Sequence, residues 1–225
     1  MTTKTPTPTR QRRKEARPQE LLSAALELFV EKGFAATRTD DVAARAGVAK
    51  GTVYLYYPSK EDLLKAVVRD NLSTLIAEGA SIAGSFSGST QELLVLLMQT
   101  WWDRVGNTKA SGIFKVIITE MGNFPDFAQF YLHEVMEPGH DLFTRVLQRG
   151  IDRGELRPVN VFEAVHVLIF PMLMLCLHKH SLGACSGMEP LMDPRSFIAT
   201  HVDVVVRGLL VRAEEGAAAK SPRRP

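Results

Sequence analysis

The chain has 225 residues, of which 45% are hydrophobic and 23% are charged, so it can bury one large core or two modest ones. This composition excludes a wholly disordered or fibrous protein. The longest apolar stretch, residues 161–177, contains a glutamate, a histidine and a proline, and the basic N-terminus lacks the apolar core of a secretory signal. We therefore expect a soluble cytoplasmic protein with no membrane partner.

Charge is distributed unevenly along the chain. Residues 1–60 contain eleven Lys and Arg against six Asp and Glu, whereas residues 61–225 contain sixteen against nineteen. The net charge is therefore +5 in the first part and −3 in the second. Such a basic segment favours a polyanionic partner for the first quarter of the chain.

The first predicted elements are a basic arm and a helix. Residues 1–17 contain six Lys or Arg and no large apolar side chain, which predicts a flexible arm. From Pro18 onward, apolar residues recur at helical spacing through Leu28 and Phe29, and Gly33 follows them as a helix terminator.

Two shorter helices are predicted next, over 39–46 and 50–57, the second ending at Pro58. Residues 47–49 join them in a tight turn that contains Gly47. Two short helices joined by such a turn are typical of the helix-turn-helix motif, whose second helix enters the major groove of DNA.

The remainder of the chain also shows only helical periodicity. Ser59 and Asp62 resemble a capping box that starts a helix running to about Glu78, and the Gly/Ser-rich segment 79–90 predicts a loop. Further helices are predicted over 91–105, 110–121, 125–154, 159–180 and 194–214, with a loop over 181–193 and a disordered tail over 216–225. The expected fold class is all-α, with nine or ten helices.

Cationic and hydroxyl side chains gather at the helix-turn-helix. Lys50 and Gly51 begin its second helix, where a cation and exposed backbone amides favour a phosphate oxygen. Hydroxyls and a further cation lie nearby in the sequence, at Thr39, Thr52, Tyr54, Tyr56 and Lys60. Phosphate contacts supply salt-sensitive affinity, and contacts to base edges supply sequence preference. The pattern favours double-stranded DNA as the partner.

Three segments resemble the DNA-binding domain of the TetR family of bacterial repressors: GFAAT at 33–37, DVAARAGV at 41–48 and KGTVYLYYPSKEDLL at 50–64. The resemblance implies a homodimer of all-helical subunits. Each would have an N-terminal three-helix helix-turn-helix domain, here 18–64, and a C-terminal helical ligand-binding and dimerisation domain, here 65–215. The positions that match DNA contacts of the family are Thr39, Ala49, Lys50, Gly51, Thr52, Tyr54, Tyr56 and Lys60.

Two positions depart from the family pattern. Ala49 stands where many members have Ser, and Leu55 stands where His or another polar residue is common. Fewer polar groups then remain to contact base edges, although either side chain could contact a thymine methyl group. The operator sequence is therefore left open.

Aromatic residues cluster in the middle of the predicted second domain. Effector pockets are mainly apolar with a few polar anchors, so we expect a subset of these residues to line one. The candidates are Trp101, Trp102, Phe114, Met121, Phe127, Phe130 and Tyr131, with Arg104, His133 and His166 as candidate anchors. The apolar stretches Val161–Leu177 and Phe197–Leu209 resemble the last two helices of the family, which form its dimer interface.

Other classes of function remain as alternatives. Cys176, Cys185 and the neighbouring histidines do not reproduce the ligand spacing of a zinc site, so we expect no metal and no cofactor. No catalytic motif is present, which predicts that the protein is not an enzyme. The main prediction is a repressor released from a pseudo-palindromic operator by a small apolar effector. The alternatives are a small-molecule-binding protein or enzyme with a vestigial DNA-binding domain, and an activator of the same fold.

Overall fold

The computed structural model describes residues 10–181 and 193–211, and these residues confirm the all-helical fold class. The only β interaction among them is an isolated bridge between Leu156 and Leu210. The predictions for residues 1–9, for the loop containing Cys185 and for the tail at 216–225 lie outside the described residues.

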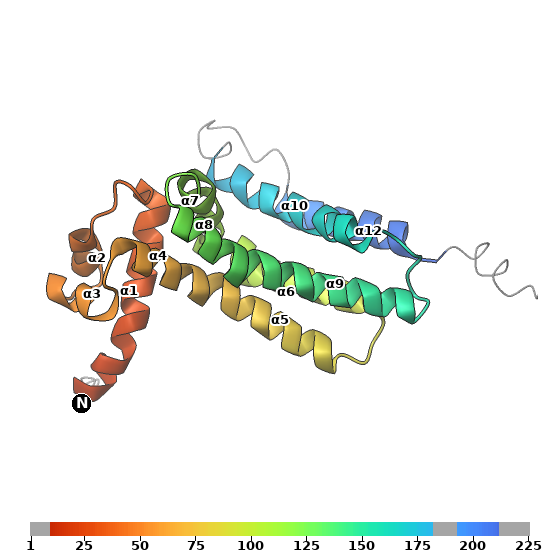
Figure 1. Ribbon diagram of the computed structural model, residues 1–225, viewed down its shortest axis with the longest axis horizontal. Coiled ribbons are helices and arrows are strands. Elements are labelled where there is room, and N and C mark those ends of the chain that lie inside the picture. The colour runs from red at the N-terminus through yellow and green to blue at the C-terminus, as the bar shows by residue number, and fades with distance from the viewer. Residues whose placement is uncertain (1–9, 182–192, 212–225) are drawn as a thin grey trace, which may run out of the picture.

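Three helices form the N-terminal end of the molecule (Figure 1). They are α1 (Arg10–Lys32), α2 (Thr39–Arg45) and α3 (Lys50–Tyr56). Helix α1 begins eight residues before Pro18, so residues 10–17 of the predicted arm are helical. These residues are Arg, Gln, Lys, Glu and Ala, all favourable helix formers, which explains why the helix extends past the proline.

A continuous helical rod leads from this end into the rest of the chain. It consists of α4 (Lys60–Val68), the π-helical segment η1 (Arg69–Ser73) and α5 (Thr74–Ser85). The predicted loop at 79–90 is therefore wrong for residues 79–85. Gly79 lies inside α5, at a point where α9 packs closely against the helix. A Cβ at this position would be 3.0 Å from Leu142 Cδ2. The glycine permits helix packing and does not end the helix.

The remaining helices complete an elongated bundle. They are α6 (Thr90–Trp101), η2 (Trp102–Gly106), η3 (Lys109–Gly112), α7 (Ile113–Glu120), α8 (Pro125–Tyr131), η4 (Leu132–Met136), α9 (Glu137–Asp152), α10 (Val161–His180) and α12 (Pro194–Leu209). Helices α5, α6 and α9 run along the long axis of the molecule, and α10 and α12 lie side by side along one edge (Figure 1). The last helix ends at Leu209, before the predicted limit at 214.

Two π-helical segments, η1 and η4, lie against each other. Pro138, just after η4, lacks the N–H that would bond to the carbonyl of Glu134 four residues earlier. The hydroxyl of Ser73 on η1 takes the place of the missing N–H: its Oγ donates to the Glu134 carbonyl at 3.0 Å. Arg69 Nε also donates to the Glu134 carboxylate, at 2.9 Å. The rod and the α8–η4–α9 segment are therefore joined by polar bonds at this point.

Helix α10 has the length and hydropathy of a membrane-spanning helix. In the structure it packs against α7, α9 and α12 as one member of the bundle. Its inward side chains, including Val165, Leu168 and Cys176, are buried in the common core.

Candidate nucleic-acid interface and effector cavity

The turn between α2 and α3 fixes how the second helix is presented. Gly47 has φ +66°, a left-handed conformation that glycine adopts without steric cost. The Val48 N–H donates to the carbonyl of Ala43 at 2.9 Å, which closes the turn. Val42 and Val53 are fully buried and hold the two helices together. The opposite face of α3 is left in solvent.

The exposed face of α3 carries most of the predicted DNA-contacting residues. Ala49, Lys50, Gly51, Tyr54 and Leu55 are exposed, and Leu55 projects furthest, at 76% exposure. The other predicted residues of this surface, Thr39, Thr52 and Tyr56, are half-buried. The Tyr54 hydroxyl lies 2.8 Å from Thr39 Oγ1, so the two hydroxyls form one polar site across α2 and α3.

Lys50 is paired within the protein. Its ammonium lies 2.8 Å from the carboxylate of Asp40 on α2, and this contact raises the pKa of Lys50. The pair is well exposed to solvent, and such pairs contribute little to stability. Lys50 can therefore exchange Asp40 for a phosphate at small cost.

Lys60, for which the sequence predicts a phosphate contact, makes contacts within the protein. Its Nζ donates to the carbonyls of Phe34, Ala35 and Thr37, at 2.9, 3.3 and 3.1 Å. The same ammonium lies 4.3 Å from the centre of the Phe34 ring. An ammonium has three donors, and these carbonyls occupy all three. Lys60 thus fastens α4 to the segment between α1 and α2.

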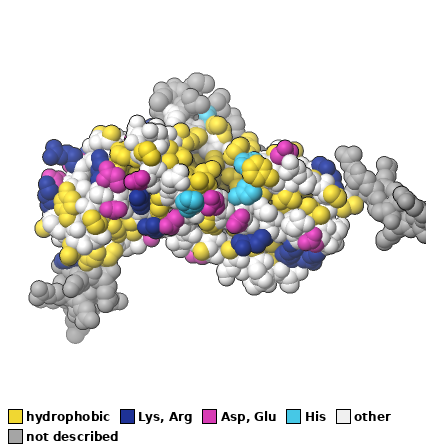
Figure 2. All heavy atoms as spheres, in the orientation of Figure 1, with side chains coloured by type: hydrophobic (Ala, Val, Ile, Leu, Met, Phe, Trp, Pro, Cys, Tyr) yellow, Lys and Arg dark blue, Asp and Glu magenta, His cyan; other side chains and the backbone are white. Residues whose placement is uncertain are grey.

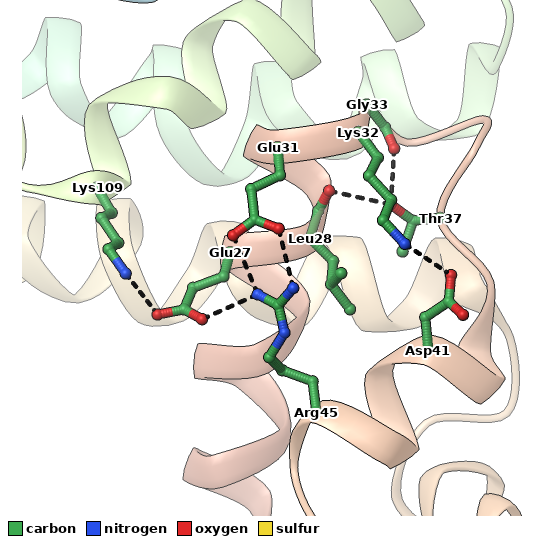
Figure 3. A network of polar contacts seen from close by, with 9 residues as sticks. All are labelled: Glu27, Leu28, Glu31, Lys32, Gly33, Thr37, Asp41, Arg45 and Lys109. Carbon is green, nitrogen blue, oxygen red and sulfur yellow. Dashed lines mark hydrogen bonds and ion pairs between the residues drawn. The ribbon is translucent and has the colours of Figure 1, made fainter.

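An ion-pair network ties α2 to α1 (Figure 3). Arg45 of α2 donates to Glu31 at 2.9 and 3.0 Å and to Glu27 at 3.2 Å. Lys109 of η3 lies 2.6 Å from the other oxygen of Glu27. The hydrogen bonds from Lys109 and then Arg45 lower the pKa of Glu27, and the bond from Arg45 lowers the pKa of Glu31. Glu27 therefore links the helix-turn-helix to the C-terminal domain.

A cavity of about 380 Å³ lies inside the C-terminal domain, within the size range of ligand sites. The segments η1–α5, α6, α7, α8–η4–α9 and α10 supply its lining residues. The wall is almost entirely apolar, and its polar side chains include Thr100, Tyr131, His140 and His166. Burial raises the pKa of Tyr131 to about 12, which keeps its hydroxyl neutral.

The predicted ligand residues divide between the cavity and its surroundings. Trp101, Phe114, Met121, Tyr131 and His166 line the cavity. The others do not: Trp102, Arg104, Phe127, Phe130 and His133.

The excluded residues have other neighbours. Trp102 is buried against Gly106, and Arg104 pairs with Glu78 at the surface. The Phe127 ring packs on that of Phe130, whose face lies 4.7 Å from the Arg69 guanidinium.

Two contributions to the cavity wall were missed from the sequence. Leu72, Leu75 and Ile76 fall within the helix predicted from Ser59 to about Glu78, but nothing local shows that they face a cavity. His140 also lines the cavity, but it stands alone in a polar stretch after Pro138, where no local pattern marks it. Its position becomes apparent only when α9 and α10 are packed together.

The cysteine and histidine residues near the end of α10 have structural contacts. Cys176 is fully buried, and burial raises its thiol pKa to about 12. His180 Nε2 lies 2.7 Å from Ser111 Oγ, which is itself fully buried and donates to the Thr108 carbonyl. Within residues 10–181 and 193–211, no group of three potential ligands could hold a metal ion.

Apolar side chains are exposed along the outer side of α10 and α12. Phe162, Phe170 and Met174 recur at intervals of four or eight residues on α10, and Val204 lies on α12. All four are more than half exposed. Figure 2 shows apolar atoms gathered over the middle of the molecule, with histidine side chains beside them. An apolar stripe of this kind is typical of a protein interface.

Two family models match the chain. The model of bacterial regulatory proteins of the tetR family matches residues 21–67, and the model of the tetracyclin repressor-like C-terminal domain matches residues 87–182. The HTH-type transcriptional regulator YfiR of Bacillus subtilis is 32% identical over 158 residues, which cover 68% of this chain and 74% of YfiR. The HTH-type transcriptional repressor KstR2 of Mycobacterium tuberculosis is 27% identical over 143 residues, which cover 64% of this chain and 70% of KstR2.

A solved structure shares the fold. The crystal structure of the transcriptional regulator FadR from Bacillus subtilis, in complex with stearoyl-CoA, has a TM-score of 0.62 at 18% identity. The match covers 85% of this chain and 98% of FadR. Together with the helix-turn-helix described above, the two family models and the YfiR relative show that this chain belongs to the TetR family of DNA-binding transcriptional regulators.

Proposed function

We propose that the protein is a cytoplasmic repressor, acting by binding and not by catalysis, whose homodimer is released from a pseudo-palindromic operator by an apolar effector. One observation carries the proposal. Leu72, Leu75 and Ile76 line the cavity, and they belong to the same helical rod as α4. Leu63 and Leu64 of α4 are buried in the core, and α4 packs on α1. A ligand that displaces this wall therefore acts directly on the helix that supports the DNA-binding domain.

The exposed face of α3 supplies the DNA contacts in this proposal. Its hydroxyls and Lys50 bond to phosphates, which fixes the position of the helix in the major groove. Leu55 and Ala49 face base edges, where an apolar side chain favours the methyl group of thymine. Two copies of α3 spaced by one helical turn of DNA, roughly 34–36 Å, would engage the two half-sites.

The apolar stripe on α10 and α12 supplies the dimer interface. A second copy of the same stripe would cover the exposed Phe162, Phe170, Met174 and Val204 side chains. This arrangement is isologous, as in most homodimers, and it holds the two DNA-binding domains in a fixed relation.

The composition of the cavity wall favours an apolar effector. The FadR structure provides a precedent for a ligand with an acyl chain in this fold. Ligand and DNA affinities are reciprocally coupled, so an effector that binds the DNA-released state more tightly weakens operator binding by the same factor.

The test begins with selection of an operator from random duplex DNA, followed by fluorescence anisotropy titrations at rising salt. We expect a pseudo-palindromic site and an affinity whose logarithm falls linearly with log salt. Leu55→Glu, on the α3 face, should lower affinity at least about tenfold, because it places a carboxylate in the groove. Leu96→Glu, at an exposed position of α6, is the matched control and should bind normally.

Fatty acids and alkanols of increasing chain length are then added to the protein–DNA complex. Release of DNA by at least one length is expected. Equal binding by wild type and Leu55→Glu, or an operator affinity that no apolar ligand changes, would overturn the proposal.

A further inference from the structure

One polar atom on the cavity wall lacks a partner. His140 lies in the first turn of α9, and its Nε2 atom is buried with no hydrogen-bond partner among the residues that the structure describes. The other ring nitrogen, Nδ1, lies 3.3 Å from Thr144 Oγ1. Buried polar atoms are nearly always paired, and an unpaired one costs roughly 1–3 kcal/mol.

Neighbouring rings hold the His140 imidazole in position. Its centroid lies 5.0 Å from that of Phe162 and 5.4 Å from that of His166, both on α10. His166 is less available to a ligand, since its Nδ1 lies 2.7 Å from the carbonyl of Phe162 in its own helix. Among the histidines that line the cavity, His140 therefore presents the buried nitrogen without a partner.

The size and polarity of the cavity define what would reach this nitrogen. A volume of about 380 Å³ lies within the range of small-molecule sites, so the cavity accepts a compact organic molecule. Nearly all atoms of that molecule must be apolar to match the wall. A single polar end placed beside His140 would satisfy the unpaired nitrogen.

We propose that His140 is the polar anchor of the cavity, where Nε2 hydrogen-bonds a hydroxyl or carbonyl oxygen at one end of an otherwise apolar effector. The inference rests on the proposed function, because it takes the cavity to be the effector site. In the neutral imidazole, the contact of Nδ1 with Thr144 decides whether Nε2 donates or accepts. A hydroxyl pairs with either form, so a medium-chain alcohol is the most general probe.

The experiment measures ligand binding by the full chain without DNA. Trp101 lines the cavity and Trp102 follows it, and these are the two tryptophans of the chain, so intrinsic fluorescence reports occupancy. The probes are 1-decanol and 1-decene, which share an apolar chain and differ in the hydroxyl. Wild type should bind 1-decanol at least about tenfold more tightly than 1-decene, the factor that corresponds to 1.4 kcal/mol.

His140→Phe keeps the ring and removes both nitrogens. It should lower the affinity for 1-decanol about tenfold and leave the affinity for 1-decene unchanged, which also shows that the cavity is intact. His133→Phe is the matched control, because His133 is exposed, lies one turn before α9 and does not line the cavity. It should bind both probes as wild type does.

A second variant covers damage to the fold. If His140→Phe binds neither probe, His140→Gln is measured instead, because its side-chain amide retains a hydrogen-bonding group. A retained preference of His140→Gln for 1-decanol over 1-decene supports the anchor. A lost preference overturns it, as does normal 1-decanol binding by His140→Phe or a wild type that does not distinguish the probes. These measurements involve no DNA. Failure of an effector to release the operator would overturn the proposed function and leave the anchor standing.

Discussion

The N-terminal domain and the helical bundle that follows it differ in how their helices are held together. In the first, Arg45 and Lys60 each make several bonds between elements, and the small core is filled by buried side chains such as Phe34. In the second, the helices surround an apolar cavity, and π-helical segments interrupt them at η1, η2 and η4. Such segments are frequent at functional sites. The N-terminal domain is therefore braced by bonds between its elements, whereas the bundle leaves unfilled space between its helices.

Truncating one leucine in each domain should show the largest difference. Leu63 is fully buried in the core of the N-terminal domain, whereas Leu173 is half-buried beside the cavity. Leu63→Ala creates a new cavity and should lower the free energy of unfolding by about 3–5 kcal/mol. Leu173→Ala only enlarges an existing cavity, so its cost should stay below about 2 kcal/mol. Urea unfolding measures both, and equal losses would contradict the comparison.

If the proposed dimer forms through the apolar stripe, a charge there should separate the subunits and leave each domain folded. Met174 is 60% exposed on α10 and does not line the cavity. Met174→Glu would bury a carboxylate between two copies and should weaken dimerisation at least about a hundredfold, or ~2.7 kcal/mol. Sedimentation velocity across a dilution series measures the effect, with Leu96→Glu as the control. An unchanged dimer would place the interface elsewhere.

Replacing Lys60 tests whether its bonds serve the fold or the DNA. Lys60→Met keeps the apolar stem and leaves three carbonyls without their donor, so the free energy of unfolding should fall by about 1.5–3 kcal/mol. The salt dependence of DNA binding should remain as in wild type. The opposite pattern, normal stability with a log–log salt slope reduced by about 0.9, would assign Lys60 to a phosphate.

The smallest expected effect is on the acid stability of the ion-pair network. In the folded state, Lys109 and Arg45 lower the pKa of Glu27, and Arg45 lowers the pKa of Glu31. Lys32 lowers the pKa of Asp41. The contribution of these carboxylates to the free energy of unfolding is therefore complete above the pKa values of the unfolded chain, which are about 4.5 or lower. It is lost as the pH falls through the lower pKa values of the folded state.

Arg45→Gln removes the partner of two of these groups. The fall in Tm between about pH 6 and about pH 3 should then be smaller than in wild type. Because the groups are exposed, raising the salt concentration should reduce the difference between the two proteins. A wild type and variant with parallel Tm curves would show that the network does not stabilise the domain.

The helix-turn-helix could be located from the sequence almost to the residue because its signals are local. Gly47 marks the turn and Pro58 follows the second helix, so the predicted ranges 39–46 and 50–57 differ from the structure by one residue each. The role of Lys60 could not be predicted in the same way. Its three acceptors lie 23 to 26 residues earlier, and only folding brings them together.

In the C-terminal domain, the helices were predicted better than their contacts. Gly79 predicted a loop, because nothing in the neighbouring sequence shows that Leu142 packs closely against this glycine. Aromatic residues were equally good candidates for the cavity, yet Trp101 lines it and the adjacent Trp102 packs against Gly106. Helical periodicity identifies an apolar face. It does not show whether other side chains pack against that face or whether a cavity lies there.

The bond from Ser73 to the Glu134 carbonyl acts as a latch on the resting molecule. Pro138 has no N–H to donate to that carbonyl, so sliding η1 past η4 removes the hydrogen bond that Ser73 supplies. In the proposed mechanism, an effector that moves the rod must supply the free energy of this bond from its own contacts. A molecule whose contacts do not offset the loss of this bond would, in the same mechanism, occupy the cavity and still leave the operator bound.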